Sequence, residues 1–327
     1  MSDKIRVESV GIVYNDDNHN AFTDMCWFSG RIYLAFRNCP DGHTIFDTSK
    51  IIVMSSTDGA DWREEFSFSV PDRDVRDPHL LAFGDKLFVY TGTWYCEQDH
   101  DINRHLGYCA WTDDTEVGSW NGPKHLEGTY GHYIWRAIAH AGRAYLCGRR
   151  KREFAHTEST GDGAAITEAA ILESKDGFIW RHLGLTQPVH GGETAFHFEE
   201  DGTALAVARC DDGTPTQICR SSAPYVDWTQ TDLDRQIGGP MLAKWGDLYL
   251  VAGRKYGERR SAVTSLYLLD DDSLEEVADL PSGGDTSYPG FVSLSETEGL
   301  LSYYSSHEGS GDGTAPSSIY MARLSRG

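Results

Sequence analysis

The key to the architecture is Gly30-Arg31-Ile32-Tyr33-Leu34-Ala35-Phe36-Arg37, a glycine turn that opens a mostly apolar run of strand-forming residues. The pattern returns five more times along the chain, at residues 84–90, 142–147, 202–209, 246–252 and 299–304. Six copies of one unit in 327 residues indicate a repeat architecture.

Each copy leads through a loop into a second strand and another turn, so each unit has room for about four short strands. In the first four units that second strand is followed by a tryptophan: Trp62, Trp120, Trp180 and Trp228. No long apolar pattern with a helical period interrupts the units. Four-stranded units of this length are typical of β-propeller blades. We therefore predict an all-β, six-bladed β-propeller of antiparallel blades, with residues 1–327 forming a single domain.

The sixth unit lacks a final strand of its own, because the chain ends soon after Ser318-Ile319-Tyr320-Met321-Ala322. The segment Ile5–Tyr14, which precedes the first unit, could supply that strand. We predict that this N-terminal segment completes the last blade and closes the ring.

The charge excludes some partners. With 50 acidic and 29 basic residues the net charge is −21, which repels the phosphates of nucleic acids. No run approaches the roughly 18 apolar residues of a membrane span, so no membrane partner is expected. The segment Met1-Ser2-Asp3-Lys4-Ile5 begins no apolar signal region, which predicts a cytoplasmic protein or one whose signal has been removed. The sequence does not indicate an oligomeric state.

Signals for cofactors are missing from the sequence. The seven cysteines match no zinc-binding spacing, and no glycine-rich phosphate loop occurs. We expect no metal or other cofactor, and mostly reduced thiols. Whether Cys210 and Cys219 pair is left open.

Two turns share the pattern Ser-x-Asp-Gly-x-x-Trp, namely Ser56-Thr57-Asp58-Gly59-Ala60-Asp61-Trp62 and Ser174-Lys175-Asp176-Gly177-Phe178-Ile179-Trp180. The aspartate can accept bonds from the backbone two residues on, and the glycine suits a positive φ. Such turns resemble the Asp-boxes, or BNR repeats, of the sialidase-like superfamily. Residues 222–228 form a degenerate third copy.

The resemblance extends over nearly the whole chain and is to the prokaryotic branch labelled exo-α-sialidase. The segments that carry it, besides the turns, are residues 19–24, 76–78, 238–240, 282–288 and 303–308. It implies an active site on the propeller axis. In sialidases a tyrosine is the nucleophile, a glutamate activates it, an aspartate is the acid/base, and three arginines hold the substrate carboxylate.

Aligning the units places one residue of each blade at the start of its innermost strand, where the six converge on the axis. The six are Asp24, Asp77, Arg136, Glu193, Pro240 and Tyr288. They can be read as polar caps of the channel or as parts of a site. The resemblance implies that Tyr288 is the nucleophile and Glu193 its base. It also implies that Arg209 and Arg254 are two of the three arginines that hold the substrate carboxylate, here called the clamp arginines.

The chain departs from the family at two places. Where sialidases carry Arg-Ile-Pro, it has Phe22-Thr23-Asp24, so the first clamp arginine is missing. Its candidate substitutes are Arg37, Arg76 and Arg136. The acid/base is also open: the candidates are Asp24, Asp77 and His43, the last of which lies in the loop where sialidases place their aspartate. His307 is a further candidate for substrate binding.

These observations predict an exo-acting glycoside hydrolase that releases a terminal acidic sugar, either sialic acid or a related uronic or ulosonic acid, from glycans or oligosaccharides. Two alternatives remain at this point: a glycan-binding propeller without catalysis, and a polysaccharide lyase that acts on uronates. The fold alone does not distinguish them.

Overall fold

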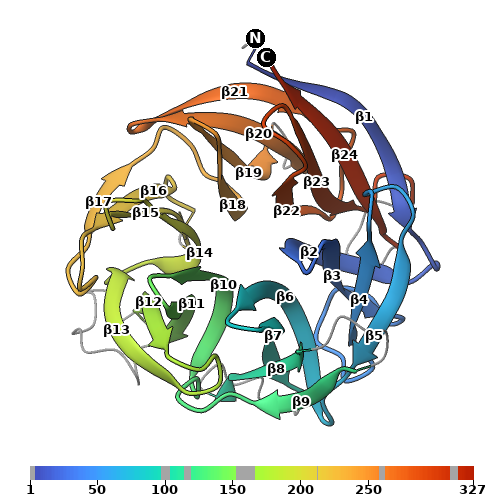
Figure 1. Ribbon diagram of the computed structural model, residues 1–327, viewed down its shortest axis with the longest axis horizontal. Helices are drawn as coiled ribbons and strands as arrows, with labels where there is room; N and C mark the ends of the chain where they lie inside the picture. The colour runs from blue at the N-terminus through green and yellow to red at the C-terminus, as the bar shows by residue number, and fades with distance from the viewer. Residues whose placement is uncertain are drawn as a thin grey trace.

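The computed structural model describes residues 4–96, 104–113, 119–151, 166–211, 213–257, 262–309 and 316–327. Its elements are 24 β-strands in six four-stranded antiparallel sheets, arranged as a ring around one axis (Figure 1). The predicted six-bladed propeller is therefore confirmed. Within the described residues no helix is long and apolar enough to cross a membrane.

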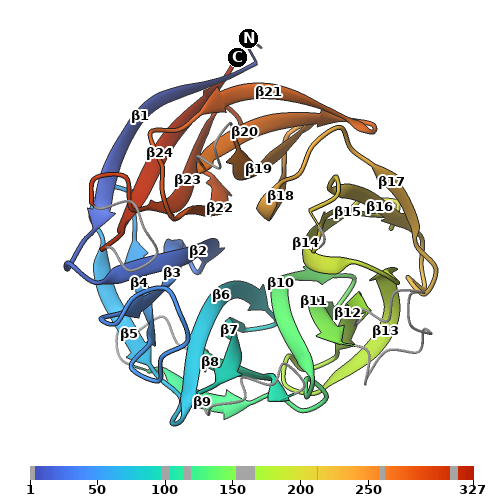
Figure 2. The same cartoon turned by 180° about the vertical axis from the view of Figure 1, so that it is seen from behind.

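The first strand of each blade lies innermost and the fourth outermost, as both views of the ring show (Figures 1 and 2). The first three blades are β2 (His19–Phe28), β3 (Arg31–Cys39), β4 (Lys50–Ser56) and β5 (Arg63–Phe68); β6 (Arg73–Phe83), β7 (Lys86–Tyr95), β8 (Leu106–Thr112) and β9 (Asn121–His125); and β10 (His132–His140), β11 (Arg143–Lys151), β12 (Thr167–Ser174) and β13 (Trp180–Gln187). The next two are β14 (Gly191–Phe198), β15 (Ala204–Cys210), β16 (Gln217–Ser221) and β17 (Thr229–Asp232); and β18 (Gly238–Trp245), β19 (Leu248–Tyr256), β20 (Ala262–Asp270) and β21 (Ser273–Asp279).

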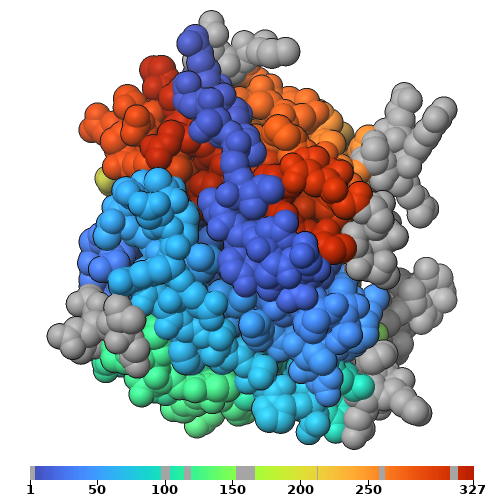
Figure 3. Space-filling model, turned by 90° about the vertical axis from the view of Figure 1, so that its right-hand side faces the viewer, coloured from blue at the N-terminus to red at the C-terminus, as the bar shows by residue number. Residues whose placement is uncertain are grey.

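The last blade is built from both ends of the sequence. It contains β22 (Thr286–Ser293), β23 (Glu298–Ser305), β24 (Ser318–Arg326) and, on its outer edge, β1 (Ile5–Tyr14). β1 pairs antiparallel with β24, with Ile5 opposite Arg326. Figure 3 shows the N-terminal strand running down the outside of the ring beside the C-terminal segments. The predicted closure by the N-terminal strand is confirmed.

Apolar side chains pack between neighbouring blades, which makes the core a ring of clusters. Phe36 and Ile52 of the first blade are completely buried, as are Phe88 and Val89 of the second. The second and third strands of each blade lie between other strands and carry these buried residues, whereas outer strands such as β9 are exposed. All seven cysteines are free thiols, five of them buried.

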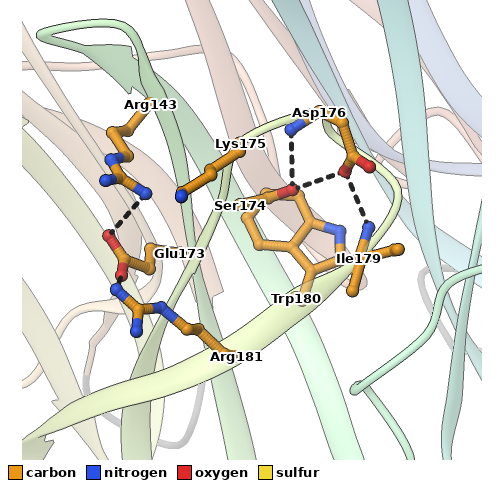
Figure 4. A pocket seen from close by; sticks show the side chains of 8 residues that line it. All are labelled: Arg143, Glu173, Ser174, Lys175, Asp176, Ile179, Trp180 and Arg181. Carbon is orange, nitrogen blue, oxygen red and sulfur yellow. Dashed lines mark hydrogen bonds and ion pairs between the residues drawn. The ribbon is translucent and has the colours of Figure 1, made fainter.

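The two Ser-x-Asp-Gly turns fold in the same way. In the second, Asp176 Oδ1 accepts a bond from the Ile179 amide at 2.9 Å (Figure 4). It also accepts one from the Phe178 amide at 2.8 Å, and Ser174 Oγ accepts one from the Gly177 amide at 2.9 Å. Gly177 has φ of +81°, and a Cβ there would lie 2.7 Å from Phe88 Cζ. The glycine is therefore required twice, by the backbone and by the packing. A cavity of about 380 Å³ opens beside this turn, on the outer part of the blade.

A β-bulge interrupts the innermost strand of every blade at the same height. The pairing with the second strand shifts between Ala21 and Asp24, Arg76 and His79, Trp135 and Ala137, Gly191 and Thr194, Gly238 and Met241, and Ser287 and Gly290. Five of the bulges contain a residue with positive φ: Phe22, Asp77, Arg136, Gly239 and Tyr288. Bulges redirect side chains and are frequent beside active sites.

Candidate active site

Tyr288 and Glu193 meet on the axis, from bulges two blades apart. Tyr288 Oη donates a 2.7 Å hydrogen bond to Glu193 Oε1. The other carboxylate oxygen, Oε2, accepts bonds from Arg209 Nη1 at 2.7 Å and from the Gly239 amide at 3.0 Å. Tyr288 is 8% exposed, so its ring is held in place while its hydroxyl has one defined partner. The two residues that the resemblance pairs are therefore in direct contact.

The surroundings separate the protonation states of this pair. Burial and the charge of Glu193 raise the pKa of Tyr288 well above its ordinary value. Burial acts to raise the pKa of Glu193 as well, but the charge and hydrogen bond of Arg209, together with the Tyr288 hydroxyl, lower it to about 2. At neutral pH the phenol therefore holds its proton, and an ionised carboxylate stands ready to accept it.

Two arginines flank the pair. Arg209 binds Glu193, and the Arg254 guanidinium lies 5.3 Å from the centre of the Tyr288 ring. Arg254 is held by the Thr286 carbonyl at 2.7 Å and by the Tyr304 hydroxyl at 3.1 Å. The Arg209 and Arg254 side chains remain 23% and 15% exposed, so both can meet a ligand. Positive charge thus borders the pair on two sides within a strongly acidic protein.

The three candidates for the third arginine have different surroundings. Arg76 lies over the Phe22 ring at 5.6 Å, and Phe22 in turn packs against Tyr288 at 4.9 Å between ring centroids. Arg37 is completely buried and bonds Asp74 Oδ1 at 2.9 Å, so it offers no atom to a ligand. Arg76 and Arg136 each expose 11% of their side chain, and each lies over an aromatic ring that packs on Tyr288; for Arg136 that ring is Trp135.

Arg136, the third of these candidates, bridges the axis together with Asp24. Arg136 Nη1 bonds Asp24 Oδ1 at 2.7 Å, and its Nη2 bonds the Pro289 carbonyl at 2.5 Å, so it links three blades. Both residues line a small cavity of about 130 Å³. Burial works against ionisation of Asp24, yet the charge of Arg136 keeps the pKa of Asp24 below its ordinary value. Asp24 is therefore an ion-pair partner in the described arrangement.

The alignment that placed Asp24 beside Asp77 and Tyr288 was wrong for the first blade. The bulge there covers Phe22 and Thr23, and Asp24 already pairs with Ala35 beyond it. Phe22 therefore occupies the position that corresponds to Asp77 and Tyr288. Because successive residues of a strand face opposite sides, a small error of register moves a side chain into different surroundings.

Asp77 is a buried carboxyl group next to the pair. The Tyr133 hydroxyl donates to its Oδ2, while its Oδ1 is buried with no hydrogen-bond partner among the described residues. Burial raises the pKa of Asp77 to about 7, and the negative charge of Glu193 acts in the same direction, against the opposing effects of Arg76 and Tyr133. The group is therefore close to half protonated at neutral pH.

This raised pKa predicts that Asp77 destabilises the fold as the pH rises. The native state binds the Asp77 proton more tightly than the unfolded chain, so stability falls between the ordinary pKa and about pH 7. Relative to the wild type, Asp77→Asn should therefore gain roughly 2 kcal/mol of unfolding free energy between about pH 5 and about pH 8. Urea unfolding at the two pH values measures it, with Asp201→Asn on the exposed surface as control. An unchanged difference between variant and wild type would mean that Asp77 titrates normally.

The Asp285 carboxylate bonds four side chains. Its Oδ2 lies 2.8 Å from His19 Nε2 and 2.6 Å from His43 Nδ1. Its Oδ1 accepts bonds from the Tyr304 hydroxyl at 2.7 Å and from Arg254 Nη2 at 3.3 Å. Asp285 was not predicted as a site residue; the signal available was its place three residues before Tyr288. His307, by contrast, bonds Ser305 and packs on Tyr320, apart from this network.

His19, His43 and Asp285 place one ligand atom each within 4.8 Å of one another, a spacing that could suit a metal ion. The tautomer of His19 argues against one. Arg37 Nη1 lies 3.3 Å from His19 Nδ1 and can only donate, so His19 carries its proton on Nε2, directed at Asp285. That nitrogen then has no lone pair for a metal. The cluster fits a hydrogen-bond network.

Comparison with known proteins bears on the fold. No family model matches the chain, and no curated protein matches it in sequence. Among solved structures it is similar to Trypanosoma rangeli sialidase, with 14% identity and a TM-score of 0.69 over 94% of this chain and 55% of that one. A Hadza microbial sialidase gives 14% identity and 0.69 over 93% and 65%. The GH43 enzyme from Xanthomonas citri, complexed with xylotriose, gives 16% and 0.58 over 96% and 89%.

The chain spans just over half the length of the Trypanosoma rangeli enzyme, so the likeness concerns the propeller part. At these identities the comparisons carry the fold and no more. The chain therefore has the propeller fold that is found in sialidases and in a GH43 glycoside hydrolase.

Proposed function

We propose that this protein is an exo-acting glycoside hydrolase that releases a terminal acidic sugar from glycans. The observation that carries the proposal is the 2.7 Å hydrogen bond from Tyr288 to Glu193, set between Arg209 and Arg254. A glycan-binding propeller would need the arginines but not a phenol bonded to an ionised carboxylate. The propeller fold of known glycoside hydrolases agrees with this proposal at the level of the fold.

In the proposed reaction Tyr288 Oη attacks the anomeric carbon and its proton passes to Glu193. A phenol is a weak nucleophile at its ordinary pKa, and an adjacent base overcomes this. A neutral nucleophile also avoids the repulsion that a carboxylate would meet from an anionic sugar. A tyrosine nucleophile is a known exception to the scheme of two carboxylates in glycoside hydrolysis.

Arg209 couples substrate binding to this proton transfer. In the free protein it holds the pKa of Glu193 down to about 2, which makes Glu193 a weak base. A substrate carboxylate that shares the Arg209 guanidinium weakens this hold, so the pKa of Glu193 rises when the substrate is bound. An acidic sugar therefore strengthens the base that its own cleavage requires.

The bridge made by Arg136 supports action on chain ends. It joins Asp24 and the Pro289 carbonyl across the axis, one residue beyond Tyr288 along β22. A site that is closed on its inner side admits a ligand from the mouth only. A terminal sugar fits such a site, whereas an internal sugar would need two open ends.

The test is a panel of aryl glycosides of ulosonic, uronic and neutral sugars, with the released sugar measured for each. We expect release from at least one acidic sugar and none from the matched neutral sugars. An unsaturated product would identify a lyase. Binding of acidic sugars without release would identify a binding propeller, and either result would overturn the hydrolase.

Replacing Arg254 tests the carboxylate clamp. Arg254→Gln should lower kcat/KM for an acidic glycoside by about a hundredfold, mostly through KM, because a charge-assisted pair to the substrate is lost. Steady-state kinetics checks this, with Arg220→Gln on the exposed surface as the matched control. If both variants lose the same activity, or neither does, Arg254 does not bind the carboxylate.

A further inference from the structure

We infer that His43 is the acid/base of the proposed hydrolysis and that Asp285 is its positioning residue. The inference rests on the proposed function. His43 lies in the loop between β3 and β4, and its ring packs on Phe22 at 5.6 Å between centroids. Phe22 packs in turn on Tyr288 at 4.9 Å. The imidazole and the nucleophile therefore pack against the same Phe22 ring.

The hydrogen bonds fix which nitrogen of His43 faces the ligand. Asp285 Oδ2 accepts the Nε2 proton of His19, whose Nδ1 is taken by Arg37. His43 approaches the same oxygen through Nδ1 at 2.6 Å. An ionised carboxylate only accepts, so Nδ1 of His43 carries a proton and Nε2 is left to exchange one with a ligand.

Asp285 is suited to hold this arrangement. Burial opposes its ionisation, but the bonds from His19 and His43 hold the pKa of Asp285 well below its ordinary value. Tyr304 and Arg254 satisfy its other oxygen, and Ser306 Oγ accepts the Asp285 amide at 2.9 Å. The backbone of His43 is anchored as well, since its carbonyl accepts a 2.7 Å bond from Arg76.

Exposure separates His43 from the other candidates. The leaving group of an exo-acting hydrolase points out of the mouth, so the acid must be accessible there. The His43 side chain is 34% exposed, whereas that of His19 is completely buried. Asp24 is bound by Arg136 and by the Leu80 amide, and the unpaired oxygen of Asp77 is buried. Of the candidates, His43 is the most exposed, since the side chain of Asp24 is only 13% exposed and both of its oxygens are bonded.

The proposed hydrolysis proceeds in two steps, and His43 transfers a proton in each. In the first, protonated His43 gives its Nε2 proton to the glycosidic oxygen as the C–O bond breaks. Tyr288 Oη bonds the anomeric carbon, and the phenol proton goes to Glu193. In the second, neutral His43 takes a proton from water, whose oxygen attacks the anomeric carbon. The bond to Tyr288 breaks and the phenol recovers its proton from Glu193.

The experiment compares leaving groups. For His43→Ala, kcat/KM should fall by about 10² to 10⁴ on glycosides with a poor, alkyl or sugar leaving group, the range of general acid catalysis. On the matched dinitrophenyl glycoside, whose leaving group needs no proton, the first step should change by less than about tenfold. Added azide should speed turnover of the dinitrophenyl glycoside by His43→Ala, since it attacks the glycosyl-enzyme without a base.

His43→Asn keeps a donor for Asp285 and should show the same dependence on the leaving group, which separates lost chemistry from lost structure. Asp285→Asn should show it more weakly, and His307→Ala not at all. Equal losses on both leaving groups would make His43 a binding residue and overturn the inference, as would unchanged kinetics. If the wild-type protein is inactive on all acidic glycosides, the proposed function is wrong. If the wild type is active but the His43 variants do not depend on the leaving group, only the inference about His43 is wrong.

Discussion

Tyr288→Phe should lower turnover by three orders of magnitude or more while leaving the fold and ligand binding nearly unchanged. Loss of a nucleophile in other hydrolases costs on the order of 10⁶ in kcat, and about 10³ is the least we expect. The substitution removes one oxygen atom, and the aromatic contacts of the ring to Phe22 and Trp135 remain. Single-turnover kinetics and calorimetric titration with the released sugar measure the two effects.

Glu193→Gln provides the companion variant. It keeps the shape of the side chain and can still accept from Tyr288, but it cannot take a proton at neutral pH. Turnover should fall in the same way, and the loss in the double variant should be much smaller than the product of the single losses, because the two residues act as a unit. A Tyr288→Phe protein with near-normal turnover would leave a carboxylate mechanism or a binding propeller as the explanation.

Arg37→Met should destabilise the fold by about 2–3 kcal/mol, the usual cost of losing hydrogen bonds to a buried charged group. Asp74 loses its bond from Arg37 but keeps Arg76 Nε as a partner at 2.7 Å. Arg37 and Asp74 are both completely buried, and Arg37 also donates to the Gly42 and Thr44 carbonyls at 3.0 and 3.1 Å. These bonds hold the loop that carries His43 against the second blade. Denaturant unfolding measures the loss.

The matched control for this prediction is Arg220→Met. Arg220 pairs with Asp272 at the surface, where both side chains are more than a third exposed, and such pairs contribute about 0–1 kcal/mol. Equal stability losses in the two variants would show that burial of the Arg37 pair has no special weight. A stable Arg37→Met protein with weakened sugar binding would show that Arg37 binds the substrate.

The propeller architecture could be predicted from the sequence because each blade repeats a short local pattern of residues. Each glycine turn and apolar strand is visible in a few residues, and the missing last strand of the sixth unit pointed to Ile5–Tyr14. The pairing of Tyr288 with Glu193 was also predictable, because both residues begin innermost strands and the family resemblance implied that they are nucleophile and base.

The other parts of the candidate site depend on contacts between distant residues. Asp285 meets His19 and His43 across more than 240 positions of sequence, and no local pattern marks such a meeting. Arg37 is buried because Asp74 of the next blade neutralises it. Asp24 was displaced from its predicted role by a bulge at Phe22, and a bulge leaves the alternation of apolar residues almost unchanged.

The repeated bulge makes the channel mouth suitable for combinatorial engineering. Its residues sit outside the regular ladder of hydrogen bonds, so their side chains can be exchanged while the neighbouring pairs of the sheet persist. Phe22, Asp77, Arg136 and Pro240 then form a four-position library in four blades, while Tyr288 and Glu193 stay fixed for the proposed chemistry. Positions with positive φ favour glycine, asparagine and aspartate, which limits the residue types that can be introduced there. Within those residue types, substrate specificity can be redesigned one blade at a time while the propeller fold is kept.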